Sequence, residues 1–361
     1  MQREIKISQF RFTNCVTHME GYRMVVGESW QKPMKGRPMA KLWYKLLRLH
    51  GPISRLSKHL SNVNKTIAKA RTDLRLAQEE LCLDRMNSEI INKVKSCTDS
   101  VIYWHEINDQ MMRQRTKIDW LRKGDSNTDF FYASLKAKHA ATSIKVLHKD
   151  DGSVLQNSDA IAAEICDFYK NLMGSRDSRL QMIDITVMRE GPQLSGLERN
   201  CLIAPITLTE IKFALKGIGD LKSPGIDGSG AKFFKSSWEI IEQDVIDAVK
   251  EFFEHTVIYK AMNETIVTLI PKHPAAKTIR DYHPIAGCST FYKIISKILT
   301  ARLGKVLGSV SNKAQAAFVT GQHIQNHILL ATKLIKGYNR QMISPRCMIQ
   351  LDLQKAYDMV D

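Results

Sequence analysis

The stretch LSKHLSNVNKTIAKARTDLRLAQEEL, residues 56–81, decides the fold class of this 361-residue chain. Its apolar residues recur at alternating steps of four and three, which is the heptad pattern of a helix that packs along one narrow stripe. Most residues between them are charged or polar, so the rest of the helix surface faces water. The stripe contains Leu56, Leu60, Val63, Ile67, Ala70, Leu74, Ala77 and Leu81.

A second stripe with the same spacing follows and predicts a partner for the first helix. We expect residues 42–121 to form a long antiparallel helical hairpin, because a turn between the two helices brings the stripes together. Two interpretations of the hairpin are open: a solvated spacer, which is simpler, or a helix pair that lies along a phosphate backbone. The second stripe contains Val94, Cys97, Val101, Trp104, Asn108 and Met111.

Short strands and further helices are predicted after the hairpin. Residues 144–147 and 154–155 flank the turn signal Asp150–Gly152 and should pair as a small β-hairpin. A helix is expected over Ser158–Met173, and Thr209 is the expected N-cap of another helix. Together these patterns predict a fold that is mainly α with small β elements (α+β).

The last third of the chain begins with the turn-rich loop SPGIDG, residues 223–228, ahead of a predicted helix at 231–255. The β-branched run TIVTLIPK, residues 265–272, predicts a buried strand. Two helices and a final strand complete the pattern, at residues 292–305, 324–338 and 347–351. The first of these helices should face its apolar residues inward: Tyr292, Ile295, Ile298, Leu299 and Leu303. It should face its basic residues outward: Lys293, Lys297, Arg302 and Lys305.

The composition points to a polyanionic partner. Lys and Arg number 53 against 37 Asp and Glu, which leaves a net charge of +16, and such a surplus is typical of proteins that bind nucleic acid. The seven cysteines are scattered, so they encode neither a zinc knuckle nor a disulfide framework. The sequence has no secretory signal and no apolar run of the ~20 residues that a membrane helix needs. We therefore expect an intracellular protein, nuclear or cytoplasmic, without a membrane segment.

Five motifs in a fixed order resemble the reverse transcriptase domain of LINE-type, non-LTR retrotransposons, particularly those of plants. They are SPGIDG, LIPK, YHPIAGCSTFYKIISKILTARL, QAAFVTGQHIQNHILLATKLI and IQLDLQKAYDMV. Upstream, WLRKGDSNTDFFYASLKAKHAATSI looks like the segment that joins endonuclease to polymerase in such polyproteins, and FRFTNCVTHMEGYRMVVGESW looks like the end of the endonuclease. The resemblance covers nearly the whole chain.

The resemblance implies an internal fragment of a longer polyprotein with four regions. Residues 1–37 would be the tail of an endonuclease-like domain, and residues 38–145 a helical spacer. Residues 146–204 would be a small mixed linker region. Residues 205–361 would be the N-terminal part of a reverse transcriptase domain, containing the fingers and the first palm strand.

The resemblance also implies functional residues. Asp352 matches the family's first metal-binding carboxylate, Tyr357 its steric gate against a ribose 2′-hydroxyl, and Lys272 the fingers lysine near the incoming triphosphate. Polymerisation uses two divalent ions held by carboxylates from two strands, and the family's Tyr/Phe-Ala-Asp-Asp box for the second strand is absent from these 361 residues. We therefore expect a Mg²⁺ site that is incomplete at Asp352 and a chain that is inactive alone.

Two residues depart from the family pattern. His283 replaces the arginine that would hold the triphosphate, and histidine is largely neutral at pH 7 and lacks the guanidinium fork. Gln322 stands where a second cation is usual. RNA and DNA are the implied partners, and the rival interpretations are a nucleic-acid-binding module without catalysis and a non-functional product of a decayed element. The candidate nucleic-acid contacts are Lys136, Lys138, Lys293, Lys297 and Arg302.

Overall fold

The computed structural model describes residues 10–117, 142–174, 184–312 and 323–336, together with isolated residues between 133 and 140 and between 314 and 349. The chain divides into two compact units. Unit 1 comprises Met1–Ser143, Ile206–Ala276 and Tyr282–Ser296, and unit 2 comprises Ile144–Pro205, Lys277–Asp281 and Lys297–Asp361. Helices predominate, and the strands of the described residues form two small antiparallel pairs. The predicted fold class, mainly α with small β elements, is confirmed.

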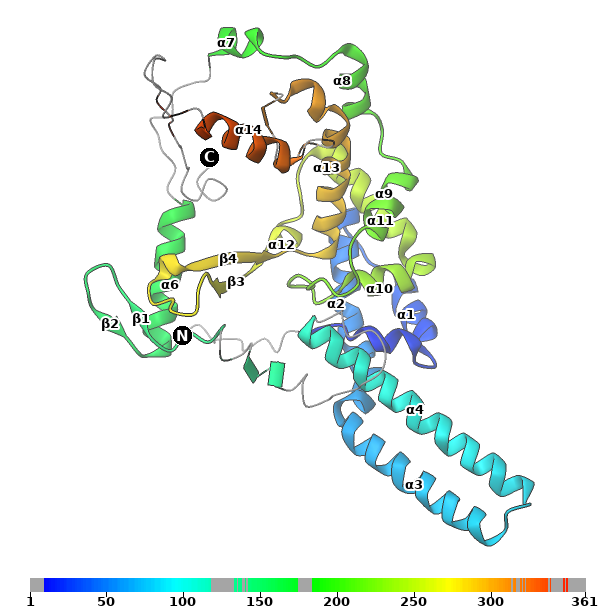
Figure 1. Cartoon of the computed structure of the whole chain (residues 1–361). Helices are drawn as coiled ribbons and strands as arrows, with labels where there is room; N and C mark the ends of the chain where they lie inside the picture. The colour runs from blue at the N-terminus through cyan, green and yellow to red at the C-terminus, as the bar shows by residue number, and fades with distance from the viewer. Residues whose placement is uncertain are drawn as a thin grey trace, which may run out of the picture. The chain divides into compact units, whose positions relative to one another are not determined.

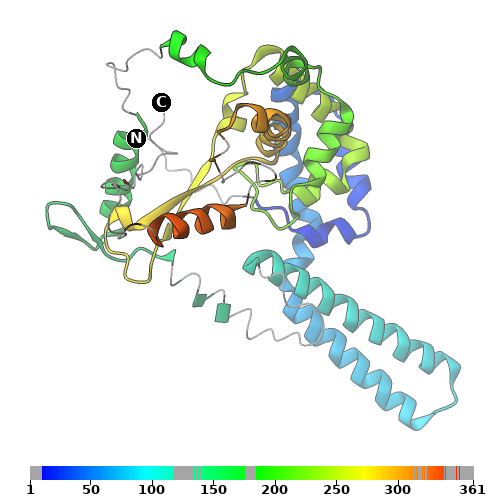
Figure 2. The same ribbon diagram turned by 45° about the horizontal axis from the view of Figure 1, so that its top comes forward.

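The predicted hairpin is formed by α3 (Val63–Leu83) and α4 (Ser88–Thr116), which lie side by side in both views (Figures 1 and 2). The stripe residues on these two helices are buried or half-buried, and Ala77 is completely covered. Asn87 caps α4, because its Oδ1 accepts from the backbone N–H groups of Glu89 and Ile90 at 3.0 and 3.4 Å. The hairpin is shorter than predicted, since the 3-10 helix η2 (Ser57–Asn62) separates α3 from the preceding helix.

That preceding helix, α2 (Pro38–Leu56), packs on α1 (Tyr22–Gln31) and α11 (Trp238–His255) to form the core of unit 1. Glu251 of α11 accepts a hydrogen bond from the backbone N–H of Met39 at 2.7 Å, which satisfies a donor in the first turn of α2. The buried residues of α2 recur at helical spacing: Met39, Leu42, Trp43, Leu46, Leu49 and Ile53.

Two helix boundaries differ from those predicted. Ser237 separates α10 (Ala231–Ser236) from α11, because its backbone leaves the helical conformation and its Oγ lies 2.7 Å from the Tyr22 hydroxyl. Thr207, not Thr209, caps α9 (Leu208–Lys216). Its hydroxyl accepts from the backbone N–H of Glu210, whose carboxylate accepts in return from the Thr207 N–H, so the two residues form a capping box.

The strands β3 (Ile266–Pro271) and β4 (Tyr282–Gly287) follow the short helix α12 (Lys260–Asn263). They pair antiparallel, from Ile266 opposite Gly287 to Pro271 opposite Tyr282. The prediction of a buried strand is wrong, because Val267, Ile270 and Ile285 are 46%, 43% and 51% exposed. The apolar composition of residues 265–272 predicted burial, but β3 pairs only with β4 in a two-stranded hairpin, which leaves these side chains accessible.

Unit 2 contains the predicted β-hairpin, in which β1 (Leu147–His148) pairs with β2 (Val154–Leu155). Its small core joins Leu147, Ile161 of α6 (Ser158–Gly174) and Ile279 of the 3-10 helix η3 (Ile279–Asp281). The hairpin and α6 confirm the predicted elements. The helices α7 (Ile185–Glu190) and α8 (Gly196–Ile203) follow and bury no residue.

The helix α13 (Thr290–Val310) begins in unit 1 and ends in unit 2. The predicted face is wrong in part, because Leu299 and Leu303 are exposed whereas Arg302 is buried. The last described helix is α14 (Ile324–Lys336), at the predicted place. Among the described residues, none of the helices has the length and apolar character needed to cross a membrane.

Candidate nucleotide and nucleic-acid interface

The SPGIDG loop is held against other segments of unit 1 through its two glycines. Gly228 has a φ of 68°, a left-handed conformation that glycine adopts without a Cβ penalty, and its carbonyl accepts from the Phe12 N–H at 3.0 Å. Gly225 lies so close to the backbone of Ser289 that an added Cβ would be 2.5 Å from its Cα. The loop therefore packs directly on the backbone that joins β4 to α13.

Asp227 is the unusual residue of this loop because its carboxyl group is buried. The residue is 1% exposed, its Oδ2 accepts from the Ser229 N–H at 3.3 Å, and its Oδ1 has no hydrogen-bond partner among the described residues. Burial raises the pKa of Asp227 to about 6. Lys293, which donates to the Ser223 carbonyl at 2.6 Å, has its pKa lowered by burial, with the Asp227 charge opposing that change. The Asp227 carboxyl group of the loop and the Lys293 amine beside it are therefore both partly removed from water.

We expect Asp227 to lower the free energy of unfolding of unit 1 as the pH rises from about 4 to 7, by up to about 3 kcal/mol. The carboxyl group ionises near pH 4 in the unfolded chain and only near pH 6 in the folded one, so the folded state binds more protons between these values. His50 has the opposite effect on the pH dependence of unfolding, because burial lowers its pKa and the folded state therefore binds fewer protons than the unfolded one. Its Nε2 contacts the Asp227 carbonyl at 2.9 Å. Urea unfolding followed by tryptophan fluorescence should show that the free energy of unfolding declines less steeply with pH in Asp227→Asn than in the wild-type protein. Parallel curves for the two proteins would contradict this prediction.

The β3–β4 hairpin carries the two predicted nucleotide contacts that lie within the described residues. Lys272 directly follows Pro271 at the end of β3, and His283 lies on β4 opposite Ile270. Both side chains are exposed. Since paired residues of an antiparallel ladder share a face, His283 lies on the face of Ile270 and Ile285. A primary amine and an imidazole therefore reach solvent at the same end of the hairpin.

Two adjoining cavities form a groove between the C-terminal turn of α4, the 3-10 helix η1 (Asn14–His18) and residues 219–224. Their volumes are about 600 and 570 Å³, and both are lined by Lys117, Leu221 and Lys222. We call them the basic groove, because Asp220 is the single acidic residue among their lining residues. The basic lining residues are Arg11, His18, Arg113, Arg115, Lys117, Lys222 and Lys232.

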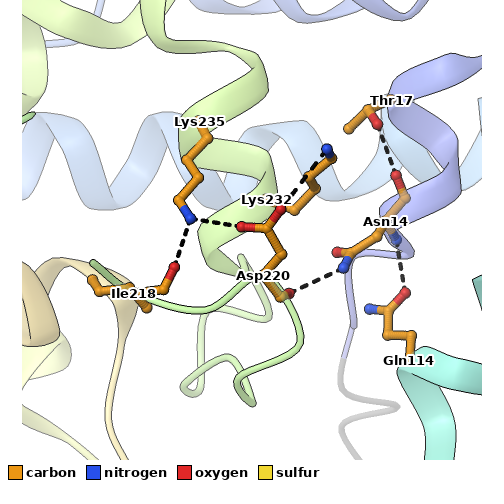
Figure 3. Close-up of polar contacts among 7 residues, drawn as sticks. All are labelled: Asn14, Thr17, Gln114, Ile218, Asp220, Lys232 and Lys235. Carbon is orange, nitrogen blue, oxygen red and sulfur yellow. Dashed lines mark hydrogen bonds and ion pairs between the residues drawn. The ribbon is translucent and has the colours of Figure 1, made fainter. Parts of the chain in front are cut away.

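Asp220 joins the walls of the groove (Figure 3). Its Oδ1 accepts from Lys235 Nζ at 2.7 Å, and its Oδ2 lies 3.8 Å from Lys232 Nζ. Its backbone carbonyl accepts from the Asn14 side chain at 3.0 Å, while the Asn14 N–H donates to Gln114 Oε1 at 2.8 Å. The 219–224 segment, η1 and α4 are therefore fixed to one another by hydrogen bonds, and the groove is a built feature of unit 1.

Of the predicted nucleic-acid contacts, Lys136 and Lys297 are exposed and Lys293 is half-buried beside the SPGIDG loop. Four of the predicted site residues lie outside the described residues: Lys138, Gln322, Asp352 and Tyr357. Residues 348, 350 and 351 of the strand predicted at 347–351 also lie outside them. The described residues contain no group of three or more His, Cys, Asp or Glu side chains that could hold a metal ion. The Mg²⁺ site at Asp352 therefore stays a prediction.

The prediction that Arg302 faces outward is wrong. Its side chain is 6% exposed and donates three hydrogen bonds within unit 2, at 2.6 to 3.1 Å, to the carbonyls of Leu202, Ala204 and Pro205. A guanidinium group that satisfies three carbonyls at the end of α8 is a structural C-cap. We no longer expect it to contact nucleic acid.

Sequence reasoning also missed the basic groove. Arg11, Arg113 and Lys222 come from three segments separated by about a hundred residues each, so no local motif unites them. The available signal was the net charge of +16, which predicts a basic surface without locating it.

No protein-family model matches the chain. The chain is 30% identical over 251 residues to the "Transposon TX1 uncharacterized 149 kDa protein" of Xenopus laevis. The matched part is 68% of this chain, and it is 19% of the relative, so the chain spans about a fifth of the relative's length. This similarity supports the coarser part of the resemblance, namely that the chain is related to a transposon protein.

Proposed function

We propose that this chain supplies the nucleotide-binding fingers of a non-LTR retrotransposon reverse transcriptase, an RNA-directed DNA polymerase. The observation that carries the proposal is the β3–β4 hairpin, which presents Lys272 and His283 together at one end. The order of the five sequence motifs and the similarity to a transposon protein support the same assignment. Lys272 would contact the triphosphate, and His283 would stand in for an arginine.

The activity that we assign to these 361 residues is binding rather than synthesis. In-line attack on a triphosphate needs two metal ions clamped by carboxylates from two strands, and the sequence supplies the first of these carboxylates in Asp352 without the second box. The residues of the hairpin can orient a triphosphate by charge and hydrogen bonds. Mg²⁺, RNA and DNA remain the expected cofactor and partners.

The test is a gain of affinity in the variant His283→Arg. Arginine restores a charged, bidentate hydrogen-bonding group at a position that faces solvent beside Lys272, so binding of a fluorescent deoxynucleoside triphosphate should tighten about tenfold. Lys272→Ala should weaken binding by a similar factor. His255→Arg is the matched control, because it adds the same charge at another exposed histidine of unit 1.

Equal tightening by His283→Arg and His255→Arg would show that net charge alone governs affinity, and the hairpin assignment would fail. Undetectable binding by all four proteins in a titration would also refute it.

A second candidate function is a nucleic-acid-binding module without catalysis. The basic groove favours it, since the groove lies apart from the β3–β4 hairpin in sequence and needs no metal. Salt-dependent binding of RNA by a monodisperse protein that fails to bind triphosphates would favour this candidate. Aggregation without any binding would favour a decayed element, with which His283 and Gln322 also agree.

A further inference from the structure

The basic groove has a charge imbalance that its internal contacts do not remove. Its one acidic residue, Asp220, is already paired with Lys235 and lies near Lys232. Arg113 reaches Asp109 at 4.0 Å, a weak ion pair at the surface. Arg11, Arg115 and Lys222 are exposed along the lining. Like charges gathered in one concave place repel one another and attract an anion.

The helix dipole of α4 explains only part of this cluster. Arg113 and Arg115 lie in its last turn, and Lys117 is its C-cap, where cations interact favourably with the unpaired carbonyls. Arg11, Lys222 and Lys232 belong to other segments and gain nothing from that dipole. Their convergence on the same groove calls for a second negative partner.

Arg113 adds an independent observation. Its Nε is buried, and it has no hydrogen-bond partner among the described residues. A buried donor without an acceptor costs about 1–3 kcal/mol, more when the group is charged. An anion in the groove is a suitable acceptor for a guanidinium group of this kind.

We propose that the basic groove binds the phosphate backbone of a nucleic-acid strand, at a site distinct from the β3–β4 hairpin. Phosphates are the chemistry that the lining fits, because guanidinium and ammonium groups from three segments converge there and carboxylates are scarce. Phe12 is the single Phe, Tyr or Trp residue of the lining and is buried, so the exposed imidazole of His18 is the one ring of the lining on which a base could stack. The site therefore holds a strand by charge and shows little sequence preference.

The SPGIDG loop links this site to the hairpin. Ser223 and Pro224 line the groove, while Gly225 packs on the backbone of Ser289, two residues after the end of β4. A strand in the groove would thus lie against the loop that supports the base of the hairpin. The inference shares only the class of ligand with the proposed function and holds whether or not the hairpin binds a triphosphate.

The test reverses two exposed charges of the groove in the double variant Arg115→Glu, Lys222→Glu. Affinity for a fluorescein-labelled single-stranded RNA should fall at least about tenfold at low salt, and the slope of log affinity against log salt should decrease by ~1.4, since each lost phosphate contact contributes ~0.7. The matched control is Lys216→Glu, Lys250→Glu on α9 and α11, which changes net charge equally at two exposed lysines outside both the groove and the α3–α4 hairpin. The affinity of this control for RNA should stay within a factor of about two of the wild-type value, and its salt slope should stay the same.

Equal losses in both double variants would show that net charge alone binds RNA and would overturn the inference, as would unchanged affinity in the groove variant. Displacement of the RNA by inorganic phosphate at matched ionic strength would show a small-anion site instead. Lys272→Ala separates the two proposals, because it should retain RNA binding even if triphosphate binding is lost. Urea unfolding of each variant checks that unit 1 stays folded.

Discussion

Gly228→Ala should lower the free energy of unfolding of unit 1 by about 3 kcal/mol or more. The φ of 68° places an L-residue in the left-handed region, which costs about 1–2 kcal/mol by itself. An added Cβ would also collide with the carbonyl of Phe10, whose ring stacks on His50 at 4.2 Å. Backbone is on both sides of this contact, so no side-chain rotation relieves it. The loop must move, and the Phe12 to Gly228 hydrogen bond must break.

Urea unfolding followed by tryptophan fluorescence measures this loss in unit 1, since Trp30, Trp43 and Trp238 all belong to it. Gly21→Ala is the matched control. Gly21 has a φ of 80°, and no atom lies within 4 Å of the position that a Cβ would take. Gly21→Ala should therefore lower the free energy of unfolding only by the conformational cost of about 1–2 kcal/mol. Equal destabilisation by the two substitutions would show that the SPGIDG loop is not held in the way described above.

The helical hairpin could be predicted from the sequence because its information is local and periodic. The stripe residues from Val63 to Leu81 record the buried face of α3, and those from Val94 to Met111 record the buried face of α4. The length of the hairpin was not predictable in the same way. The stripe continues through residues 57–62, whose backbone tightens into a 3-10 helix there.

Predictions failed where a single polar contact decides the structure. The cap of α9 is a different case, because the T-x-x-E spacing of Thr207 and Glu210 is a local capping-box signal that the prediction of Thr209 overlooked. The break at Ser237 accompanies a hydrogen bond with Tyr22, 215 residues away in the sequence. Arg302 looked like an exposed cation because its acceptors are carbonyls about a hundred residues earlier. Composition and periodicity carry no record of such long-range polar partners.

In the candidate site, too, residues in local motifs could be predicted, whereas residues brought together from distant segments could not. Lys272 and His283 were found by resemblance, because they belong to short motifs on one hairpin. The basic groove was not found, since its residues come from distant segments and its identity depends on a concave surface. The sequence predicts no role for Asp227, because the burial of its carboxyl group depends on segments that are distant in the sequence.

Arg302→Met should release α8 from the rest of unit 2. The α8 helix buries none of its residues, so it depends on the contacts at its ends. At its C-terminal end the guanidinium group of Arg302 satisfies three carbonyls, and methionine can satisfy none of them. Hydrogen bonds to charged groups contribute about 1.5–3 kcal/mol each, and the freed carbonyls regain part of this loss from water, so a net cost of about 3 kcal/mol is expected.

Hydrogen exchange measured by mass spectrometry resolves this loss, because the peptide that contains Gly196–Ile203 reports on α8 alone. Exchange of its amides should accelerate about 100-fold, since each 1.4 kcal/mol of local opening energy is a factor of ten. Lys305→Met is the control, because it removes an exposed cation one turn after Arg302 on α13 and leaves the hydrogen bonds to the three carbonyls intact. Unchanged exchange in Arg302→Met would mean that Ser309, which hydrogen-bonds to Glu198, suffices to hold the helix. Accelerated exchange confined to Arg302→Met would establish this residue as the cap of α8.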